Sequence, residues 1–192
     1  ACCDNRVVPE IGYSICAKRK GLIPETLEPL VAKRIRYKMT AKQLPDGARK
    51  QAYTRRSKAL KWILVTCFGY TGYKNARFGK IEAHEAINAY GRAALIHAKE
   101  IVETRGFEVL HMLVDSLWVK KAGARDDEYP ELLAEITAQT GLPIALEGIY
   151  NWVAFLPSRQ DARVGVPNRY FGVFRDGEIK TRGIELRRGD TA

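Results

Sequence analysis

The sequence predicts an α+β fold, in which helices pack on an antiparallel sheet and a long antiparallel helical hairpin projects from it. Two observations predict this fold. The first part of the chain holds two long segments with apolar residues at helical spacing, separated by a turn signal. The second part holds short β-rich runs bounded by Gly, Asp and Pro. With 192 residues, the chain can bury a core without cross-links.

The hairpin is predicted from residues 24–42 and 48–68. The first segment carries leucines at helical spacing, and residues 43–47 read Gln-Leu-Pro-Asp-Gly, a turn signal. The second segment places Leu60, Ile63 and Leu64 toward its partner. Because the connection is short, we expect the two helices to lie side by side in opposite directions.

The remaining elements follow from local signals in the rest of the chain. We expect a helix closed by Gly106, a β-hairpin whose polar tip is Val114-Asp115-Ser116, a helix ending at Gly141, and three further strands. Their predicted ranges are 80–104, 107–119, 126–140, 149–156, 169–174 and 178–185.

The charge of the chain is concentrated in one segment. The formal net charge is +10, yet residues 18–61 alone carry 14 basic and 3 acidic residues, a net charge of +11. Such a block suits a polyanion, because phosphate contacts supply most non-specific affinity for nucleic acids. A solvated basic face without a partner is the alternative.

Neither a membrane-spanning segment nor a signal peptide is expected. Every apolar run is broken well before the roughly 20 residues that a membrane span needs, so no membrane partner is predicted. The chain opens with Ala-Cys-Cys-Asp-Asn, without Met and without the pattern of a signal peptide. We therefore expect it to be an internal piece of something longer.

Three basic residues of the hairpin are predicted to converge. Arg34 and Lys38 are four residues apart and share a helix face. Lys61 is expected toward the far end of the second helix, near the base of the first. Together they could grip one polyphosphate, with Arg34 as a bidentate fork and the lysines as point charges. Enzymes that transfer nucleotides also need carboxylates for two metal ions. The tip of the predicted β-hairpin offers one such carboxylate, Asp115.

Four stretches in this order resemble family B DNA polymerases. Residues 61–78 read KWILVTCFGYTGYKNARF and resemble motif B, which is K-x-x-x-N-S-x-Y-G-Y-x-G-Y-x-x-A-R. Residues 109–119 resemble the motif C hairpin, and residues 182–190 the R-G-[IL]-E…R-R-D stretch that ends the palm. Residues 20–38 fit the lead-in and first helix of the fingers. The resemblance covers essentially the whole chain.

The resemblance implies a division of the chain and roles for particular residues. It makes residues 1–23 the lead-in to the fingers, 24–78 the fingers hairpin and 79–192 the palm. Its implied roles are triphosphate binding for Arg34, Lys38 and Lys61, catalysis and Mg²⁺ binding for Asp115, Mg²⁺ binding for Glu147, and contact with the primer-template backbone for Arg169 and Tyr170. Cys2 and Cys16 fall where some archaeal members carry a disulfide.

The departures from the family pattern also carry information. In motif C, Leu113 stands in place of the first Asp, and in motif B, Val65 replaces the Asn. With these changes the chain resembles a divergent archaeal group of family B polymerases whose palm motifs are degenerate. Motif A, which carries the other metal-binding Asp, would precede Ala1. Because one carboxylate cannot hold two Mg²⁺ ions, we expect the isolated chain to be inactive.

Two functions are therefore considered. The first is the fingers and second half of the palm of a DNA-directed DNA polymerase, with Mg²⁺ as cofactor. Its partners would be primer-template DNA, dNTP and the missing motif A, exonuclease and thumb regions, in the same or another chain. Its location would be the cytoplasm, with the nucleoid. The second is an inactive polymerase-like module that binds DNA or a partner. A basic RNA-binding protein of unrelated fold is a weaker third option, which the order of motifs argues against.

Overall fold

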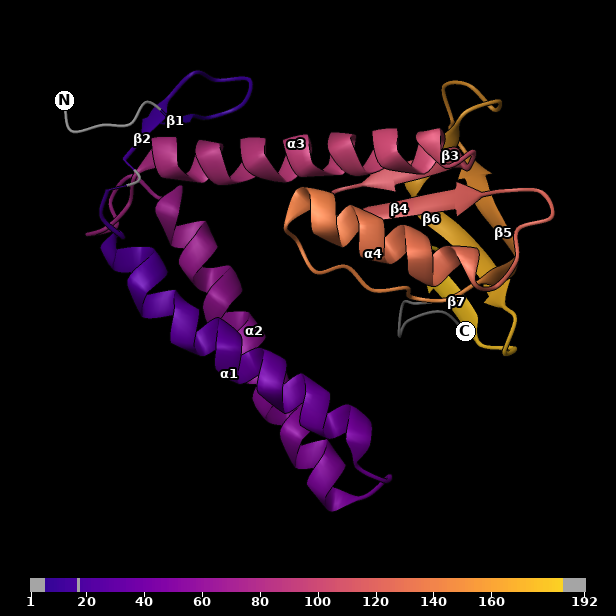
Figure 1. The fold of residues 1–192 in the computed structure, drawn as a ribbon, viewed down its shortest axis with the longest axis horizontal. Coiled ribbons are helices and arrows are strands. Elements are labelled where there is room, and N and C mark those ends of the chain that lie inside the picture. The colour runs from indigo at the N-terminus through magenta and orange to yellow at the C-terminus, as the bar shows by residue number, and fades with distance from the viewer. Residues whose placement is uncertain (1–5, 17, 185–192) are drawn as a thin grey trace. The chain divides into compact units, whose positions relative to one another are not determined.

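The structure, a computed structural model, describes residues 6–16 and 18–184. The chain forms two compact units, one ending at Tyr90 and the other beginning at Gly91. This division lies inside the long helix α3 (Ile81–Thr104), and each unit is described by itself. Figure 1 shows the course of the chain and labels its elements.

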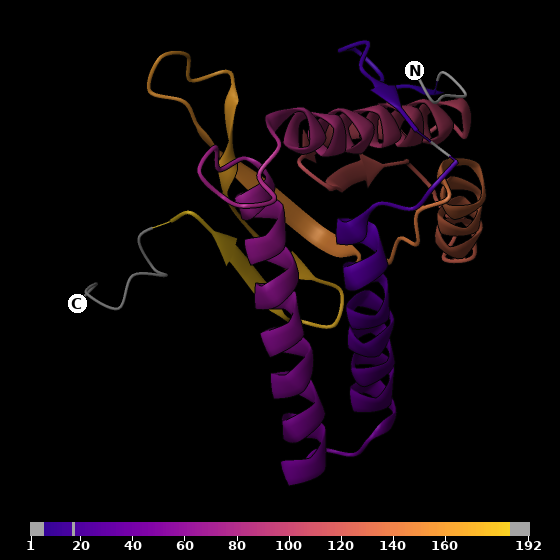
Figure 2. The same cartoon turned by 90° about the vertical axis from the view of Figure 1, so that its left-hand side faces the viewer.

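The first unit is dominated by the predicted hairpin. Helices α1 (Leu22–Gln43) and α2 (Ala48–Thr71) run antiparallel and are joined by four residues (Figures 1 and 2). Along both helices, the less exposed residues recur at alternating spacings of three and four, the pattern of a coiled-coil seam. The seam consists of Leu27, Leu30, Arg34, Tyr37 and Ala41 on α1, and Tyr53, Ser57, Leu60, Leu64 and Cys67 on α2.

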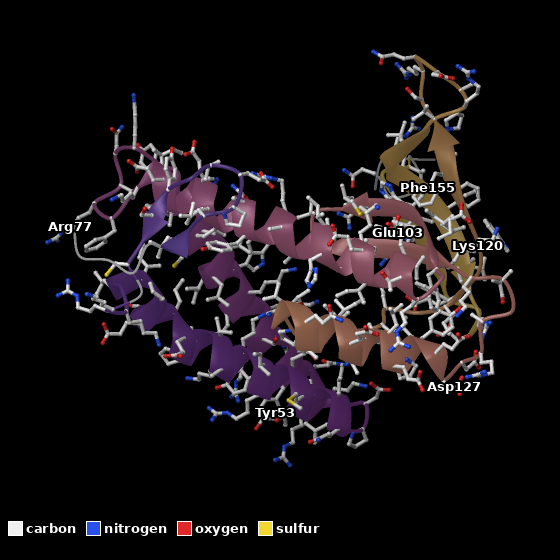
Figure 3. All side chains as sticks on the ribbon, turned by 45° about the horizontal axis from the view of Figure 1, so that its top comes forward. Tyr53, Arg77, Glu103, Lys120, Asp127 and Phe155 are labelled. Atoms are coloured by element: carbon white, nitrogen blue, oxygen red, sulfur yellow. The ribbon has the colours of Figure 1, made fainter. Side chains whose placement is uncertain are left out.

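The inward orientation predicted for Ile63 is wrong. Ile63 is 47% exposed, because it lies between the seam positions Leu60 and Leu64 and points away from α1. The facing rings of Tyr37 and Tyr53 confirm where the helices meet, with centroids 5.6 Å apart and an edge-to-face angle of 63°. Figure 3 labels Tyr53 on α2.

The lead-in to the hairpin contains two short strands that the sequence patterns did not predict. β1 (Arg6–Val7) and β2 (Ser14–Ile15) pair antiparallel. Val8, between them, is 1% exposed and packs with Ala86 and Ala89 of α3. The small alanine side chains let this ribbon lie close to the helix.

The second unit contains the predicted β-hairpin, with two helices packed against it. β3 (Glu108–Leu113) and β4 (Ser116–Lys120) pair antiparallel around the two-residue tip. The last turns of α3 and the helix α4 (Glu128–Thr140) share one core with this hairpin. Its buried members are Ala98, Ile101, Val102, Phe107, Leu132 and Ile136. Gly141 ends α4 at a φ of 71°, as expected of a C-terminal glycine.

A three-stranded antiparallel sheet completes this unit. β5 (Tyr150–Pro157), β6 (Gly165–Phe174) and β7 (Ile179–Arg182) lie in the order β5-β6-β7. Gly172 is needed in β6, because a Cβ there would lie 2.7 Å from the carbonyl oxygen of Trp152. The α+β class is confirmed. Within the described residues, however, the strands form three small antiparallel sheets rather than one.

Aromatic side chains connect the β3–β4 hairpin to the three-stranded sheet. Trp118 of β4 contacts Phe155 of β5 and Tyr170 of β6, with ring centroids 6.2 and 5.4 Å apart. His111 of β3 lies 4.9 Å from the Phe155 ring. Figure 3 labels Phe155 within this sheet. Separate β-sheets of the second unit are thus held together by edge-to-face ring contacts.

Candidate active site

The three predicted triphosphate residues all lie on the hairpin. Arg34 belongs to the seam and is half-buried, while Lys38 and Lys61 are exposed. The Nε atom of Arg34 is buried and has no hydrogen-bond partner among the described residues. A buried donor without an acceptor costs about 1–3 kcal/mol. This guanidinium group is therefore suited to an incoming acceptor.

The register of the hairpin brings Lys61 near Arg34. Tyr37 faces Tyr53, and with a rise of about 1.5 Å per residue, Lys61 falls within about 8 Å of Arg34 along the axis of the pair. Lys61 lies near the middle of α2 rather than at its far end, since α2 continues to Thr71. The same register places it opposite residue 29 of α1, about two turns from the start of that helix. Lys38 lies one turn from Arg34 on α1.

Asp115 lies at the tip of the β3–β4 hairpin, as predicted. Its N–H group donates to the carbonyl oxygen of Leu113 at 2.7 Å, and the Ser116 hydroxyl donates to its carboxylate at 3.3 Å. The preceding residue, Val114, has a φ of 55°. A β-branched residue is strained there, and such strain costs about 1–3 kcal/mol. The tip thus holds an exposed carboxylate on a tight, strained turn.

Glu147 is already engaged by another residue. This exposed side chain precedes β5, and its carboxylate forms an ion pair with Lys180 of β7. In the described part of the chain, no group of three or more His, Cys, Asp or Glu side chains could hold a metal ion. Metal binding by Asp115 therefore stays a prediction, and the described residues do not form a complete two-ion site.

The two predicted DNA-contacting residues have opposite surroundings. Tyr170 is 2% exposed, and its ring contacts Trp118 and Phe155, so it is a core residue. The prediction that its ring touches the primer-template backbone has no support in this geometry. Arg169 is half-buried and, because strand residues alternate, points to the other face of β6.

A contact at the end of α2 has no signal in the local sequence pattern, because it joins His84 to residues more than ten positions earlier in the chain. The His84 ring stacks on Phe68 with centroids 4.3 Å apart. Its Nδ1 atom lies 3.2 Å from the Thr71 hydroxyl oxygen and 3.3 Å from the Phe68 carbonyl oxygen. Gly72 leaves room for this ring, since a Cβ there would lie 3.1 Å from Nδ1. His84 thus holds the last turn of the hairpin to α3.

The predicted site residues divide between the two units. Arg34, Lys38 and Lys61 belong to the first, and Asp115, Glu147, Arg169 and Tyr170 to the second. A single site that joins Asp115 to the three cations stays a prediction. Cys2, and most of the motif at the end of the chain (Glu185, Arg187, Arg188 and Asp190), lie outside the described residues.

Comparison with known proteins identifies the family. The sequence model of DNA polymerase family B matches residues 7–128. The chain is 36% identical to DNA polymerase 2 of Saccharolobus solfataricus over 90% of its length, and 28% identical to DNA polymerase 1 of Pyrococcus abyssi over 98%. The chain belongs to DNA polymerase family B.

Solved structures agree with this assignment. The family B DNA polymerase from the hyperthermophilic archaeon Pyrobaculum calidifontis is similar over 93% of this chain, with a TM-score of 0.68 and 32% sequence identity. The match covers 22% of that polymerase, and the chain spans 24% of each of the two curated relatives. None of the described helices combines the length and apolar character needed to cross a membrane.

Proposed function

We propose that this chain supplies the fingers (24–78) and the C-terminal half of the palm (79–192) of a DNA-directed DNA polymerase. The enzyme would transfer a deoxynucleotidyl group from dNTP to the 3′-hydroxyl of a primer annealed to its template. The proposal is carried by one observation. The hairpin of a family B chain carries Arg34, whose buried Nε has no hydrogen-bond partner among the described residues, and its register places Lys61 within about 8 Å of Arg34 along the axis of the pair. It would act in the cytoplasm, on the DNA of the nucleoid.

The hairpin cations would bind and orient the triphosphate. The stem of Arg34 is held in the seam, so its fork loses little freedom when it binds phosphate oxygens. Lys38 and Lys61 have no ion-pair partner within the described residues, and their charges are available to neutralise the leaving phosphates. This arrangement favours one orientation of the nucleotide.

Asp115 would hold Mg²⁺ at the primer end. Two such ions, when bound, stabilise the entering and leaving oxygens of an in-line displacement. Asp115 fits one ligand position, and Glu147 could add a second if its ion pair with Lys180 opens. A further carboxylate must come from another segment of the same polypeptide or from a partner chain, together with the exonuclease and thumb regions. We therefore infer that the isolated chain is inactive.

Primer extension with Mg²⁺ and four dNTPs tests this proposal. The purified 192-residue chain should give no more product than its Asp115→Asn variant. The full-length polymerase that carries the chain should extend the primer, and Asp115→Asn should lower its rate by about 100-fold or more, the usual loss for a group that stabilises charge in the transition state. Incorporation by the isolated chain that Asp115→Asn abolishes would show that the chain is active alone.

An inactive module that binds DNA or a partner is the second candidate. It is favoured by Leu113, which replaces the first Asp of motif C in a chain whose described residues contain no complete metal cluster. Mn²⁺ titration of the full-length protein separates the two functions. An active palm should bind Mn²⁺ in a manner that Asp115→Asn weakens, whereas an inactive one should not.

A further inference from the structure

The first half of α2 carries an excess of positive charge. Residues 48–61 contain six basic residues and no acidic one. Two of them have local partners, since Lys50 donates to Asp46 at 2.7 Å and Arg56 lies over the Tyr53 ring. Arg55 and Lys58 are exposed and have no hydrogen bond or ion pair within the described part of the chain.

These two cations share a face of α2 with an exposed tryptophan. Gln51, Arg55, Lys58 and Trp62 follow each other at spacings of four, three and four, which places them on one side of a helix. We call these four residues the basic ridge. At 100° per residue, the ridge lies nearly opposite the seam positions of α2. Its side chains therefore face away from α1.

Trp62 is 72% exposed, although a tryptophan ring is usually covered. It lies one helical turn beyond Lys58. Toward the loop, the ridge borders a hollow of about 380 Å³ lined by polar side chains. The lining residues are Asp46, Lys50, Gln51, Thr54, Arg55 and Lys58. The ridge thus combines an aromatic face with two cations that have no ion-pair partner among the described residues, and it borders a polar recess.

We propose that the basic ridge binds single-stranded nucleic acid, with phosphates on Arg55 and Lys58 and a base stacked on Trp62. Positive grooves that track the backbone, combined with exposed aromatic rings, are the usual means of binding unpaired strands. In a duplex, the bases are stacked on each other and offer no free face to a side chain. This site goes beyond the proposed nucleotide site, because Arg34 belongs to the seam between the two helices, whereas the ridge lies on the side of α2 that faces away from the seam.

Fluorescence anisotropy of the purified chain with a fluorescein-labelled oligo(dT) tests the proposal. Trp62→Ala should weaken binding about fivefold or more, the lower end of what stacking of one base contributes. Arg55→Ala/Lys58→Ala should reduce the slope of log K against log salt by about 1.4, because two phosphate contacts to a single strand are lost. Trp62→Phe should retain binding but lose the tryptophan quenching that the oligonucleotide causes.

A matched control removes the same charge from the other helix. Arg36 and Lys42 of α1 are exposed, and Arg36→Ala/Lys42→Ala should change affinity by less than about twofold. Circular dichroism of each variant checks that its helices are kept.

Three results would overturn the proposal: no binding by the wild-type chain, an equal loss in the control, or tighter binding to polyglutamate than to the oligonucleotide. The last result would assign the ridge to an acidic protein. All these variants leave Arg34, Lys38 and Asp115 intact, so failure here does not affect the proposed nucleotide site.

Discussion

Val114 and Asp115 show how one strained residue can set the position of a predicted metal ligand. Val114 is 79% exposed, so burial of its side chain does not explain its φ of 55°. Its conformation closes the two-residue turn and lets the Asp115 N–H group reach the carbonyl oxygen of Leu113. The turn, rather than side-chain packing, therefore sets the direction of the carboxylate.

Replacing Val114 with Gly should stabilise the chain. Glycine adopts a positive φ without a Cβ clash, so we expect Val114→Gly to raise the free energy of unfolding by about 1 kcal/mol. Urea unfolding followed by tryptophan fluorescence measures this change. Val109→Gly is the control, and it should destabilise, because Val109 lies in β3 and packs against the core. A destabilising Val114→Gly would show that the turn is not strained.

Some residue-scale features could be predicted from sequence and others could not. The tip that carries Asp115 was predicted, because a polar pair between two β-rich runs is a local signal. The pairing of Glu147 with Lys180 was not, since these residues are brought together only by the fold of the three-stranded sheet. The burial of Tyr170 depends likewise on contacts with Trp118 and Phe155, which are distant in sequence.

At the scale of elements, His84 joins α2 to α3. Its ring stack on Phe68 and its contacts with Thr71 fix the last turn of the hairpin. His84→Ala should speed hydrogen exchange of the amides in that turn by about tenfold, because one stacked pair and one hydrogen bond are lost. His97→Ala is the control, since His97 is partly exposed and lies 3.5 Å from Glu100 on its own helix. Equal exchange in both variants would contradict the role of His84.

The start of α4 should respond to acid through Glu128. Its carboxylate accepts hydrogen bonds from the Lys121 ammonium and, at 2.8 Å, from the Arg125 N–H group, and both lower its pKa below the usual 4.5. A lowered pKa in the folded state stabilises the protein above pH 4.5, and this contribution is lost as the pH falls through the lowered pKa. Glu128→Gln should therefore make the melting temperature fall less steeply as the pH is lowered below 4.5. Glu131→Gln, which removes an exposed carboxylate nearby, should leave this pH dependence unchanged. An equal effect of both variants would contradict this account.

The helices were predicted better than the sheets. The predicted ranges 24–42, 48–68 and 80–104 agree with α1, α2 and α3 to within three residues, because helix periodicity and turn signals are local. The strands β1 and β2 have only two residues each and no periodicity to reveal them. The separation of the strands into three sheets depends on long-range contacts such as those of Trp118, which no local pattern encodes.

At the scale of the whole molecule, the positive charge and the predicted catalytic carboxylate are separated along the chain. The hairpin unit carries the excess of basic residues, and the second unit carries Asp115. The family was predicted from four ordered motifs and is confirmed. The single site that would join the units stays a prediction. The proposed two-metal site would also need carboxylates beyond those of the described residues, and the chain spans 24% of each of the two curated relatives.

The measurement that tests this account most directly is the effect of Lys61→Ala in the full-length polymerase. We predict that it raises the KM for dNTP by about tenfold or more, as expected for a lost bond to a charged phosphate, while the Kd for primer-template DNA changes less than about twofold. The neighbouring Lys58→Ala should leave the KM for dNTP unchanged. If Lys61→Ala weakened DNA and dNTP binding equally, Lys61 would contact the DNA backbone, and the nucleotide site proposed for the hairpin would be wrong.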